Sequence, residues 1–410
     1  MKIMIRDKID ELLTRRVDKI YPSREALEKV LISGKKLKLY QGFDPTGIQL
    51  HIGHMTGLMK LRQFQELGHQ VIFLIGDGTG QAGDPSGKTR AREKFLTNKE
   101  LKENARDYVL QAAKIIDFKG KNAAQILYNS SWLNKLNLVD ILNIAQHFSL
   151  QQLEERDLYF ERKKRGETIN LREFLYPLLQ GYDSVAMGID LELGGTDQTF
   201  NMLCGRQLVG NILHREKFVM TTPLLTDSSG KKIGKTEGNV IALTAPPKDF
   251  YGMIMGLSDD VIVKSFEFLT EIPMTKVEEI SKNITGGDNP MKYKKMLAYT
   301  LTSMLNSEKE AKEAQEYFEN AFQKRNLLGL HPEAVPLAVV PNYRRINIVD
   351  LIALTDLRFV KSRSDAKRYI IQGAVELNGK KIIDSNTIVK LNNGDIIKVG
   401  KAMFKKFVDD

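Results

Sequence analysis

The spacing of apolar residues predicts a parallel α/β sheet in the first half of the chain. Short apolar runs alternate there with helical stretches, which is the pattern of strand–helix–strand units. Strands are expected in residues 36–44, 70–80 and 188–197, and a helix in residues 54–68, which stops at Gly68. The first 16 residues alternate charged and apolar positions and predict an amphipathic helix.

The pattern changes near Pro246, and from there it is mainly helical. Three prolines then fall within residues 331–343, which predicts a semi-rigid linker because proline cannot continue a helix. Beyond it, residues 346–373 predict helix, and the pairs Asn378-Gly379 and Asn393-Gly394 each predict the turn of a β-hairpin. At 410 residues the chain exceeds one ordinary core, so two or three domains are expected.

Composition is that of a soluble globular protein, with 27% charged and 42% hydrophobic residues. No apolar run approaches the roughly 20 residues that span a bilayer, and the N-terminus lacks the apolar core of a secretion signal. The single cysteine, Cys204, excludes an intramolecular disulfide framework and any multi-cysteine metal site. The cytoplasm is the simplest location.

The formal net charge of +10 is unevenly distributed. Residues 342–410 carry 14 Lys or Arg against 8 Asp or Glu, so a short C-terminal region holds most of the excess. A small basic module is typical of proteins that bind a polyanion, although a merely solvated surface would look the same by charge alone.

The strongest chemical signal is the string LHIGHMTG, in which His51, Gly53 and His54 begin a helix that follows a strand and a turn. A strand-to-helix turn at the carboxyl edge of a parallel sheet is where such folds hold nucleotides. Glycine lets a base or ribose approach the backbone, and two imidazoles can donate to phosphate oxygens in a transition state. The alternative is a pair of helix-capping or surface histidines.

This string resembles the HIGH sequence of class I aminoacyl-tRNA synthetases, and the preceding Gly42-Phe43-Asp44-Pro45-Thr46 resembles the form found in tyrosyl-tRNA synthetases. A second element, Lys231-Lys232-Ile233-Gly234-Lys235-Thr236, is similar to the KMSKS loop of the family. It departs from the consensus because Gly234 and Thr236 stand where serines would be, but both lysines are in place.

The chemistry of this second loop stands without the resemblance. Lys232 and Lys235 flank a glycine, so a mobile backbone could bring two ammonium groups onto a polyphosphate and stabilise departing pyrophosphate. A solvated basic turn is the alternative interpretation of these residues alone.

A line of polar residues predicts an amino-acid pocket. Tyr176, Gln180 and Asp183 lie at i, i+4 and i+7, which places them on one helix face between leucines. A carboxylate and an amide there can receive an ammonium, with a tyrosine hydroxyl assisting; a solvent-exposed charge at a helix end is the alternative for Asp183. The stretch resembles the tyrosine-site helix of tyrosyl-tRNA synthetases.

The same resemblance implies further contacts with the substrates. The amino-acid site would also include Tyr40, Gln198 and Asp84, of which Asp84 would lie near the ammonium. Asp183 and Tyr40 would hold the phenolic oxygen. Around ATP it implies Gly42, Gly195, Asp197 on the ribose and Thr46 at the γ-phosphate, with Asp44 contacting either the ATP or the amino group. Lys88 and Arg92 would assist pyrophosphate or meet the tRNA, with surface solvation as the alternative.

The segment from Ser362 to Ile382 is similar to S4-type RNA-binding modules. Arg363, Lys367 and Arg368 fall at i, i+4 and i+5 and form a basic stripe for an RNA backbone. Other conspicuous residues have ordinary interpretations: Trp132 is expected to pack in a core, and the remaining histidines show no metal-ligand spacing, so no metal site in the protein is predicted.

The resemblance spans essentially the whole chain. It implies a Rossmann-like catalytic domain (1–240) with an inserted dimer-contact segment near 95–170, a helical anticodon-side domain (241–330), a linker (331–343) and an S4-like domain (344–410). It further implies a homodimer that joins L-tyrosine to tRNA(Tyr) with ATP, and Mg²⁺ held through the phosphates.

Two alternatives remain open on the sequence. A tryptophan-specific relative would share the fold and both ATP loops but should lack the Tyr176, Gln180 and Asp183 line. An RNA-binding protein derived from a synthetase would have lost catalysis, which the intact histidines and lysines argue against.

Overall fold

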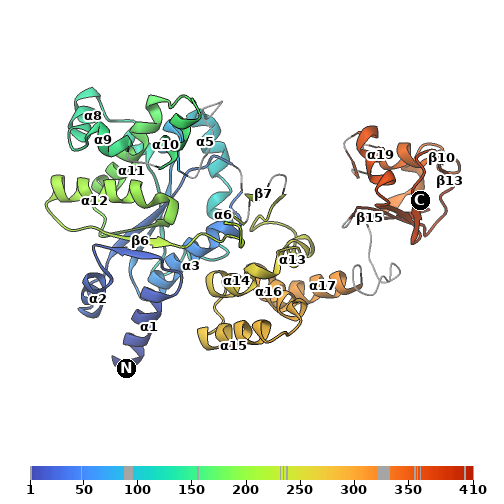
Figure 1. Cartoon of the computed structure of the whole chain (residues 1–410), viewed down its shortest axis with the longest axis horizontal. Coiled ribbons are helices and arrows are strands. Elements are labelled where there is room, and N and C mark those ends of the chain that lie inside the picture. Colours follow the sequence, from blue (N-terminus) through green and yellow to red (C-terminus); the bar gives the residue numbers. More distant parts are fainter. Residues whose placement is uncertain are drawn as a thin grey trace. The chain divides into compact units, whose positions relative to one another are not determined.

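The computed structural model describes residues 2–47, 49–86, 96–154, 157–230, 232–233, 235–236, 239–320, 333–354, 357, 359–360, 362–400 and 403–409 (Figure 1). The chain divides into two units, Met1–Lys312 and Glu313–Asp410. Among the helices within these described ranges, none is both long enough and apolar enough to cross a membrane.

A six-stranded sheet forms the centre of the first unit, in the order β1-β6-β5-β2-β3-β4. Only β1 runs antiparallel to its neighbour, and the other pairings are parallel. The predicted strands in the first half of the chain are confirmed as β2, β3 and β5. The bounds are β1 Lys19–Tyr21, β2 Lys38–Phe43, β3 Gln70–Ile75, β4 Gln125–Tyr128, β5 Leu191–Gly195 and β6 Phe218–Thr222.

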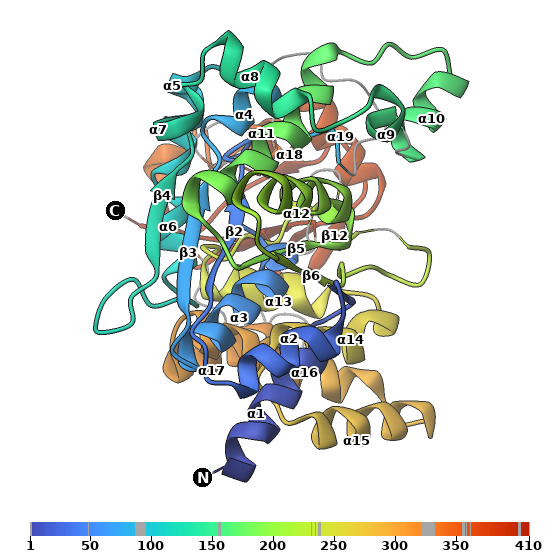
Figure 2. The same cartoon turned by 90° about the vertical axis from the view of Figure 1, so that its left-hand side faces the viewer.

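Helices cover both faces of this sheet. α11 (Leu171–Met187) and α12 (Thr199–Leu213) lie on one face, and α3 (Ile52–Glu66) lies on the other (Figures 1 and 2). α3 is the predicted helix, and Gly68, just beyond its end, adopts the left-handed backbone (φ 77°) that stops it. The predicted N-terminal helix is confirmed as α1 (Lys2–Thr14), followed by α2 (Arg24–Ile32).

The chain order of the strands creates a crevice at the middle of the sheet. From β2 the chain proceeds to β3 and β4 on one side, whereas β5 and β6 lie on the other side. In open parallel sheets, ligands bind outside the carboxyl ends of the strands where this direction switches. The switch falls between β2 and β5, whose carboxyl ends lead into the predicted site residues.

The region predicted as an insert, near 95–170, is mostly helical but is not wholly separate from the sheet. Its strand β4 forms the sheet edge, paired with β3. Helix α4 (Thr79–Ala82) precedes this region. The helices within it are α5 Asn98–Ala105, α6 Tyr108–Ala112, α7 Ser130–Leu133, α8 Leu138–Ala145, α9 Leu150–Glu154 and α10 Asp157–Lys164.

The predicted helical region after Pro246 is confirmed. Two buried cations tie it to the sheet domain, because Arg15 and Arg16 donate to the carbonyl of Thr270 beyond α14. Lys60 of α3 donates to the carbonyls of Leu12 and Arg15 and so holds the end of α1. The helices are α13 Pro247–Met255, α14 Ile262–Leu269, α15 Met274–Thr285, α16 Pro290–Leu305 and α17 Glu308–Phe318.

The second unit corrects the prediction of a linker. Residues Glu333–Pro336 form strand β9, which pairs in parallel with β15 (Met403–Val408), and Val335, Leu337 and Val340 are buried in the core of this unit. Apolar residues between the prolines gain burial there, and proline is tolerated because β9 is an edge strand.

One of the two predicted hairpins in this unit is also wrong. The Asn378-Gly379 turn joins β11 (Val375–Leu377) to β12 (Lys380–Ile382) as predicted. At Asn393-Gly394 the chain turns, but β13 (Ile388–Val389) pairs with β10 (Ile346–Asn347), while β14 (Ile396–Val399) pairs with β11 and β15. The predicted helical stretch forms α18 (Ile348–Ile352) and α19 (Arg363–Ile371).

Candidate active site

A cavity of about 480 Å³ opens at the crevice between β2 and β5. That volume is in the range of ordinary small-molecule sites. It gathers residues from six segments that the sequence analysis treated separately. The predicted site residues that line it are Tyr40, Gly42, Asp44, Thr46, His51, Gly53, His54, Asp84, Tyr176, Gln180, Asp183, Gly195, Asp197, Gln198 and Lys232.

A few predicted residues are not placed at this cavity. Lys88 and Arg92, with Gly234 of the lysine loop, lie outside the described residues. For Lys235 the structure gives the backbone, in the two-residue strand β7 (Lys235–Thr236) paired with β8 (Asn239–Val240). Arg363, Lys367 and Arg368 lie on α19 of the second unit, exposed to solvent.

The two histidines cap the helix that follows β2. His51 is the N-cap of α3: its Nδ1 accepts from the backbone N–H of Gly53 (3.1 Å), and Nδ1 of His54 accepts from the backbone N–H of His51 (3.1 Å). The rings lie 4.0 Å apart, centre to centre. The capping interpretation is therefore correct, yet both side chains also line the cavity, at the positive end of a helix dipole.

The lysine loop lies against the start of this helix. A Cβ at Gly53 would stand 2.9 Å from the ring of His51 and 3.3 Å from the carbonyl oxygen of Ile233, so only glycine permits this close approach. Lys232 forms an ion pair with Asp197 across the cavity mouth (2.7 Å). Lys232, which was predicted to bind phosphate, therefore lies at the same cavity opening as His51 and His54.

The carboxylate of Asp44 organises one wall of the cavity. It accepts from the hydroxyl of Tyr176 (2.9 Å) through Oδ2 and from Thr79 (2.7 Å) through Oδ1. Burial, with Asp44 and Asp84 nearby, raises the pKa of Tyr176 well above its ordinary value. Tyr176 therefore stays protonated and uses its hydrogen on Asp44, which leaves its oxygen as an acceptor.

Two further acceptors stand on this side of the cavity. Gln180 donates through Nε2 to Glu192 (3.0 Å), and its buried Oε1 has no hydrogen-bond partner among the described residues. Asp84 accepts from Nε2 of Gln198 (2.8 Å) and from the backbone N–H of Ser86 (2.8 Å). Gln198 thus holds Asp84 in place and itself lines the cavity.

Asp183 lies at the buried end of the cavity. It is 1% exposed, so it is not the solvent-exposed helix-end charge that was the alternative. Its oxygens accept from Nε1 of Trp132 (2.7 Å) and Nδ2 of Asn129 (3.0 Å). Burial raises the pKa of its carboxyl well above the ordinary value, and these two hydrogen bonds partly oppose the rise.

Tyr40 shares this buried end. Its hydroxyl lies 3.1 Å from Oγ of Ser184, and its pKa is raised well above the ordinary value by burial and then by Glu192 and Asp183. The deep end of the cavity therefore offers a neutral hydroxyl and a fixed carboxyl group to whatever enters.

Sequence reasoning missed several residues of this site. Asn129 follows β4 directly, and the rule that ligands meet the carboxyl ends of strands could have found it. Glu192 is a carboxylate within the apolar strand LELGG, which is itself a signal. Trp132, expected only to pack, donates to Asp183, and nothing in its local sequence indicates this bond.

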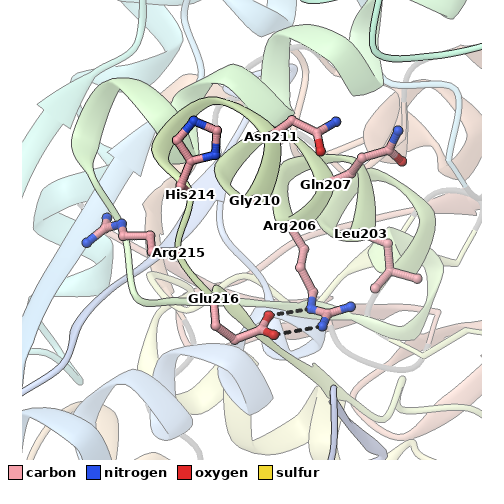
Figure 3. Close-up of a pocket in the computed structure, with 8 residues that line it drawn as sticks. All are labelled: Leu203, Arg206, Gln207, Gly210, Asn211, His214, Arg215 and Glu216. Carbon is pink, nitrogen blue, oxygen red and sulfur yellow. Dashed lines mark hydrogen bonds and ion pairs between the residues drawn. The ribbon is translucent and has the colours of Figure 1, made fainter.

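A second, shallower hollow lies along the outer side of α12 (Figure 3). An ion pair between Arg206 and Glu216 (2.7 Å) crosses it, and His214 and Asn211 stand at its rim. None of the predicted site residues lines this hollow, so the chemistry belongs to the cavity between β2 and β5. Among the residues that the structure describes, no three His, Cys, Asp or Glu side chains are placed as metal ligands.

Comparison with known families agrees with this geometry. Residues 33–323 match the profile of the tRNA synthetases class I (W and Y), and residues 352–397 match the S4 domain. The first match covers most of the chain and all the cavity-lining segments. The chain belongs to the class I tRNA synthetases of this W and Y family.

Among the individual relatives of this synthetase chain are tyrosine–tRNA ligases. It is 39% identical to the tyrosine–tRNA ligase of Dehalococcoides mccartyi strain 195 over 98% of this chain and 99% of the relative. It is 38% identical to the tyrosine–tRNA ligase of Thermotoga maritima over 96% of both chains.

Solved structures show the same synthetase fold. A C-terminally truncated mitochondrial tyrosyl-tRNA synthetase of Aspergillus nidulans gives a TM-score of 0.64 at 22% identity, over 78% of this chain and 99% of the other. The tyrosyl-tRNA synthetase of Archaeoglobus fulgidus, solved with L-tyrosine, gives 0.60 at 21% identity, over 76% and 99%. At these identities the likeness concerns the fold alone.

Proposed function

We propose that the chain is a tyrosine–tRNA ligase, which activates L-tyrosine with ATP to tyrosyl-adenylate and pyrophosphate and then transfers tyrosine to the 3′ end of tRNA(Tyr). The observation that carries this proposal is one cavity with two unlike ends: a buried polar end that fits a phenol, and a mouth with His51, His54 and Lys232 that fits a triphosphate.

The wall between the two ends fits an α-ammonium group. An ammonium has three N–H donors. Three acceptors line the cavity: the oxygen of Tyr176, Oε1 of Gln180 and the carboxylate of Asp84. Each is held by a hydrogen bond to another protein group, so the set is positioned before the substrate arrives.

The buried end fits a phenol rather than a bare ring. Asp183 and the hydroxyl of Tyr40 are buried away from water there. A ligand without a hydroxyl would leave these groups without a hydrogen-bond partner on the side that faces the ligand. Burying polar groups without such a partner is costly, so selectivity for tyrosine follows from the pocket itself.

The reaction needs no general base in the protein. The tyrosine carboxylate is already ionised and attacks the α-phosphate of ATP, so catalysis is positioning and charge stabilisation. We assign His51, His54, Lys232 and Lys235 to the phosphates with Thr46 at the γ-phosphate, and Gly42, Asp44, Gly53, Gly195 and Asp197 to the nucleotide. Mg²⁺ would accompany the triphosphate and be bound through its oxygens.

The Lys232–Asp197 ion pair bears on how ATP would enter. The same carboxylate is assigned to the ribose, so a bound nucleotide would release the ammonium of Lys232 toward the phosphates. The pair is partly exposed, and such pairs contribute less than about 1 kcal/mol, so its release costs little. Lys88 and Arg92 are retained as candidates for pyrophosphate or tRNA contact.

A homodimer is supported by exposed apolar side chains in the inserted segment. Leu138 and Leu171 are 70% and 73% exposed, and all the side chains of this group fall within residues 138–171. Exposed apolar side chains concentrated in one stretch of chain are consistent with a protein interface. The members are Leu138, Val139, Leu142, Leu150 and Leu171.

The C-terminal unit would bind tRNA through Arg363, Lys367 and Arg368, consistent with its S4-domain match. We retain the domain assignment of catalytic residues 1–240, helical residues 241–330 and S4-like residues 344–410, with the correction at 333–340. We propose a cytoplasmic location for the enzyme.

The test is amino-acid-dependent ATP–pyrophosphate exchange across all twenty amino acids, followed by charging of tRNA. The proposal expects exchange with tyrosine. Exchange with tryptophan instead would show that the chain is the tryptophan-specific relative. If the protein binds tRNA but supports exchange with no amino acid, it is an RNA-binding protein that has lost catalysis.

A further inference from the structure

A buried ion pair lies directly behind the amino-acid pocket. Glu192 is the second residue of β5 and Lys217 immediately precedes β6, and they are 1% and 0% exposed. Nζ of Lys217 donates to Oε2 of Glu192 and to the carbonyl oxygen of Met202 (3.2 Å). Lys217 does not line the cavity, whereas Glu192 does.

Stability does not account for this pair. Removing two charges from water costs several kcal/mol per ion, and apolar residues of similar volume often serve as well or better. A buried pair that reaches a binding pocket instead points to a role in fixing the geometry of that pocket.

Glu192 contacts residues at both ends of the pocket. Its Oε1 accepts from Nε2 of Gln180 (3.0 Å), and its Oε2 accepts from Oγ of Ser184 (3.3 Å). Ser184 lies 3.1 Å from the hydroxyl of Tyr40. One carboxylate therefore contacts an ammonium-site residue directly and a phenol-site residue through Ser184.

The charge of Glu192 decides which way its neighbours point. A carboxylate in an ion pair has no hydrogen to donate and can only accept hydrogen bonds. Gln180 must then turn its NH₂ group to Glu192, which leaves Oε1 for the ligand. Ser184 donates to Glu192 (3.3 Å), and its oxygen lies 3.1 Å from the hydroxyl of Tyr40.

Helix α12 leaves room for this arrangement at Gly205. A Cβ there would lie 2.5 Å from Nζ of Lys217, 3.0 Å from Oγ of Ser184 and 3.3 Å from Oε2 of Glu192. Each of these distances is shorter than ordinary contact, so a side chain at this position would displace the group.

We propose that Lys217 and Glu192 are positioning residues for the amino-acid site: the buried ion pair with Lys217 holds the Glu192 carboxylate in place, and the carboxylate orients the Gln180 amide so that its oxygen receives the substrate ammonium. This inference rests on the proposed tyrosine specificity and adds to it two residues that lie behind the pocket.

The first test is the double variant Lys217→Met with Glu192→Gln, which removes both charges together and leaves neither one unpaired. A glutamine at 192 can present either its oxygen or its NH₂ to Gln180, so the orientation is no longer fixed. The probes are L-tyrosine and 3-(4-hydroxyphenyl)propionate, which has the phenol but no amino group, measured by calorimetric titration of the full chain.

The expected result is a loss of tyrosine affinity of roughly 10- to 100-fold, the range for a hydrogen bond to a charged group. Affinity for the des-amino acid should change by less than about threefold, since it makes no bond to Gln180. A folded double variant with an unchanged affinity ratio between the two ligands would overturn the proposal, and so would an equal loss for both.

A second variant, Gly205→Ala, keeps the proposal testable if the double variant does not fold. Gly205→Ala keeps every charge but displaces the ammonium of Lys217, and it should lower the tyrosine to des-amino affinity ratio in the same direction. Gly210→Ala is the matched control in the same helix, because a Cβ there has no heavy atom within 4 Å. Equal ratios in these two alanine variants would also contradict the proposal.

The parent protein separates failure of this inference from failure of the proposed function. If the parent binds tyrosine and supports tyrosine-dependent exchange, the variants test the ion pair alone. If the parent does neither, the ligase proposal itself is overturned, and the positioning role with it.

Discussion

At the scale of single residues, the site is built from groups that each have a protein partner on one side. His51 caps a helix, Tyr176 donates to Asp44, and Asp183 accepts from Trp132. Such bonds fix direction, so the cavity presents acceptors where an ammonium is proposed and donors where phosphates are proposed. Preorganisation of this kind lowers the cost of binding and of reaching the transition state.

His51 can be tested without disturbing the helix that it caps. His51→Ser keeps a good N-cap residue but is too short to reach a phosphate, so stability should change by less than about 1 kcal/mol. Formation of tyrosyl-adenylate in a single turnover should slow by about 100- to 1000-fold, with tyrosine affinity unchanged. Weak tyrosine binding with an unchanged single-turnover rate would contradict the assigned role.

Asp183 gives a prediction about selectivity. In Asp183→Asn, one of the donors Asn129 and Trp132 must face an NH₂ group, so kcat/KM for tyrosine should fall by at least roughly 100-fold. Trp132→Phe keeps the carboxylate and one of its bonds and should lose less. The KM for ATP should stay constant in both, and a parallel rise in it would show that the lesion spreads beyond the amino-acid site.

At the scale of elements, the helices and strands predicted correctly from the sequence are those that local residue spacing determines. The strand–helix turn at His51 and the polar face of α11 follow from spacing of 2 and 3.6 residues, and both were confirmed. The prolines near residue 336 indicated a linker, but the apolar residues between them gain more by burial against β15. Strand partners also escaped prediction, because β13 pairs with β10, about 40 residues earlier in the chain.

The same limit applies to the site. Asp183 was predicted from its helix face, whereas Trp132 and Lys217 act through contacts between distant segments that no local pattern records. Residues that touch a substrate tend to fall in motifs, and residues that orient them are scattered.

His69 allows the start of β2 to be tested by pH. Its Nδ1 accepts from the backbone N–H of Leu37 (3.1 Å), and burial, with Lys36 nearby, lowers its pKa from 6.5 to about 4. Between these values the unfolded chain binds more protons, so stability is fully present above pH 6.5 and falls as the pH drops toward 4. The loss from this group should reach about 3 kcal/mol.

The measurement is urea unfolding between pH 4 and 7 for the parent and for His69→Gln, whose amide oxygen can still accept from Leu37. The variant should show a shallower fall in the free energy of unfolding over this interval. Identical pH profiles would rule out His69 as the titrating group.

At the scale of the whole molecule, the account proposes a dimer and a separate tRNA-binding unit. Leu171→Glu places a charge in the exposed leucine group and should convert a dimer to a monomer in sedimentation analysis at micromolar concentration. Ile371→Glu is the control, because Ile371 is as exposed (72%) but lies on the C-terminal unit. A dimer that survives Leu171→Glu would move the interface away from the inserted segment.

The most direct test of the central claim is the ratio of kcat/KM for tyrosine to that for phenylalanine in ATP–pyrophosphate exchange. A buried Tyr40 and Asp183 that must bond a hydroxyl predict a ratio of about 10⁴ to 10⁵, a range whose reference case is the tyrosine-specific synthetase class itself. A ratio near 100 or below, which an apolar pocket that merely tolerates a hydroxyl would give, would contradict the account.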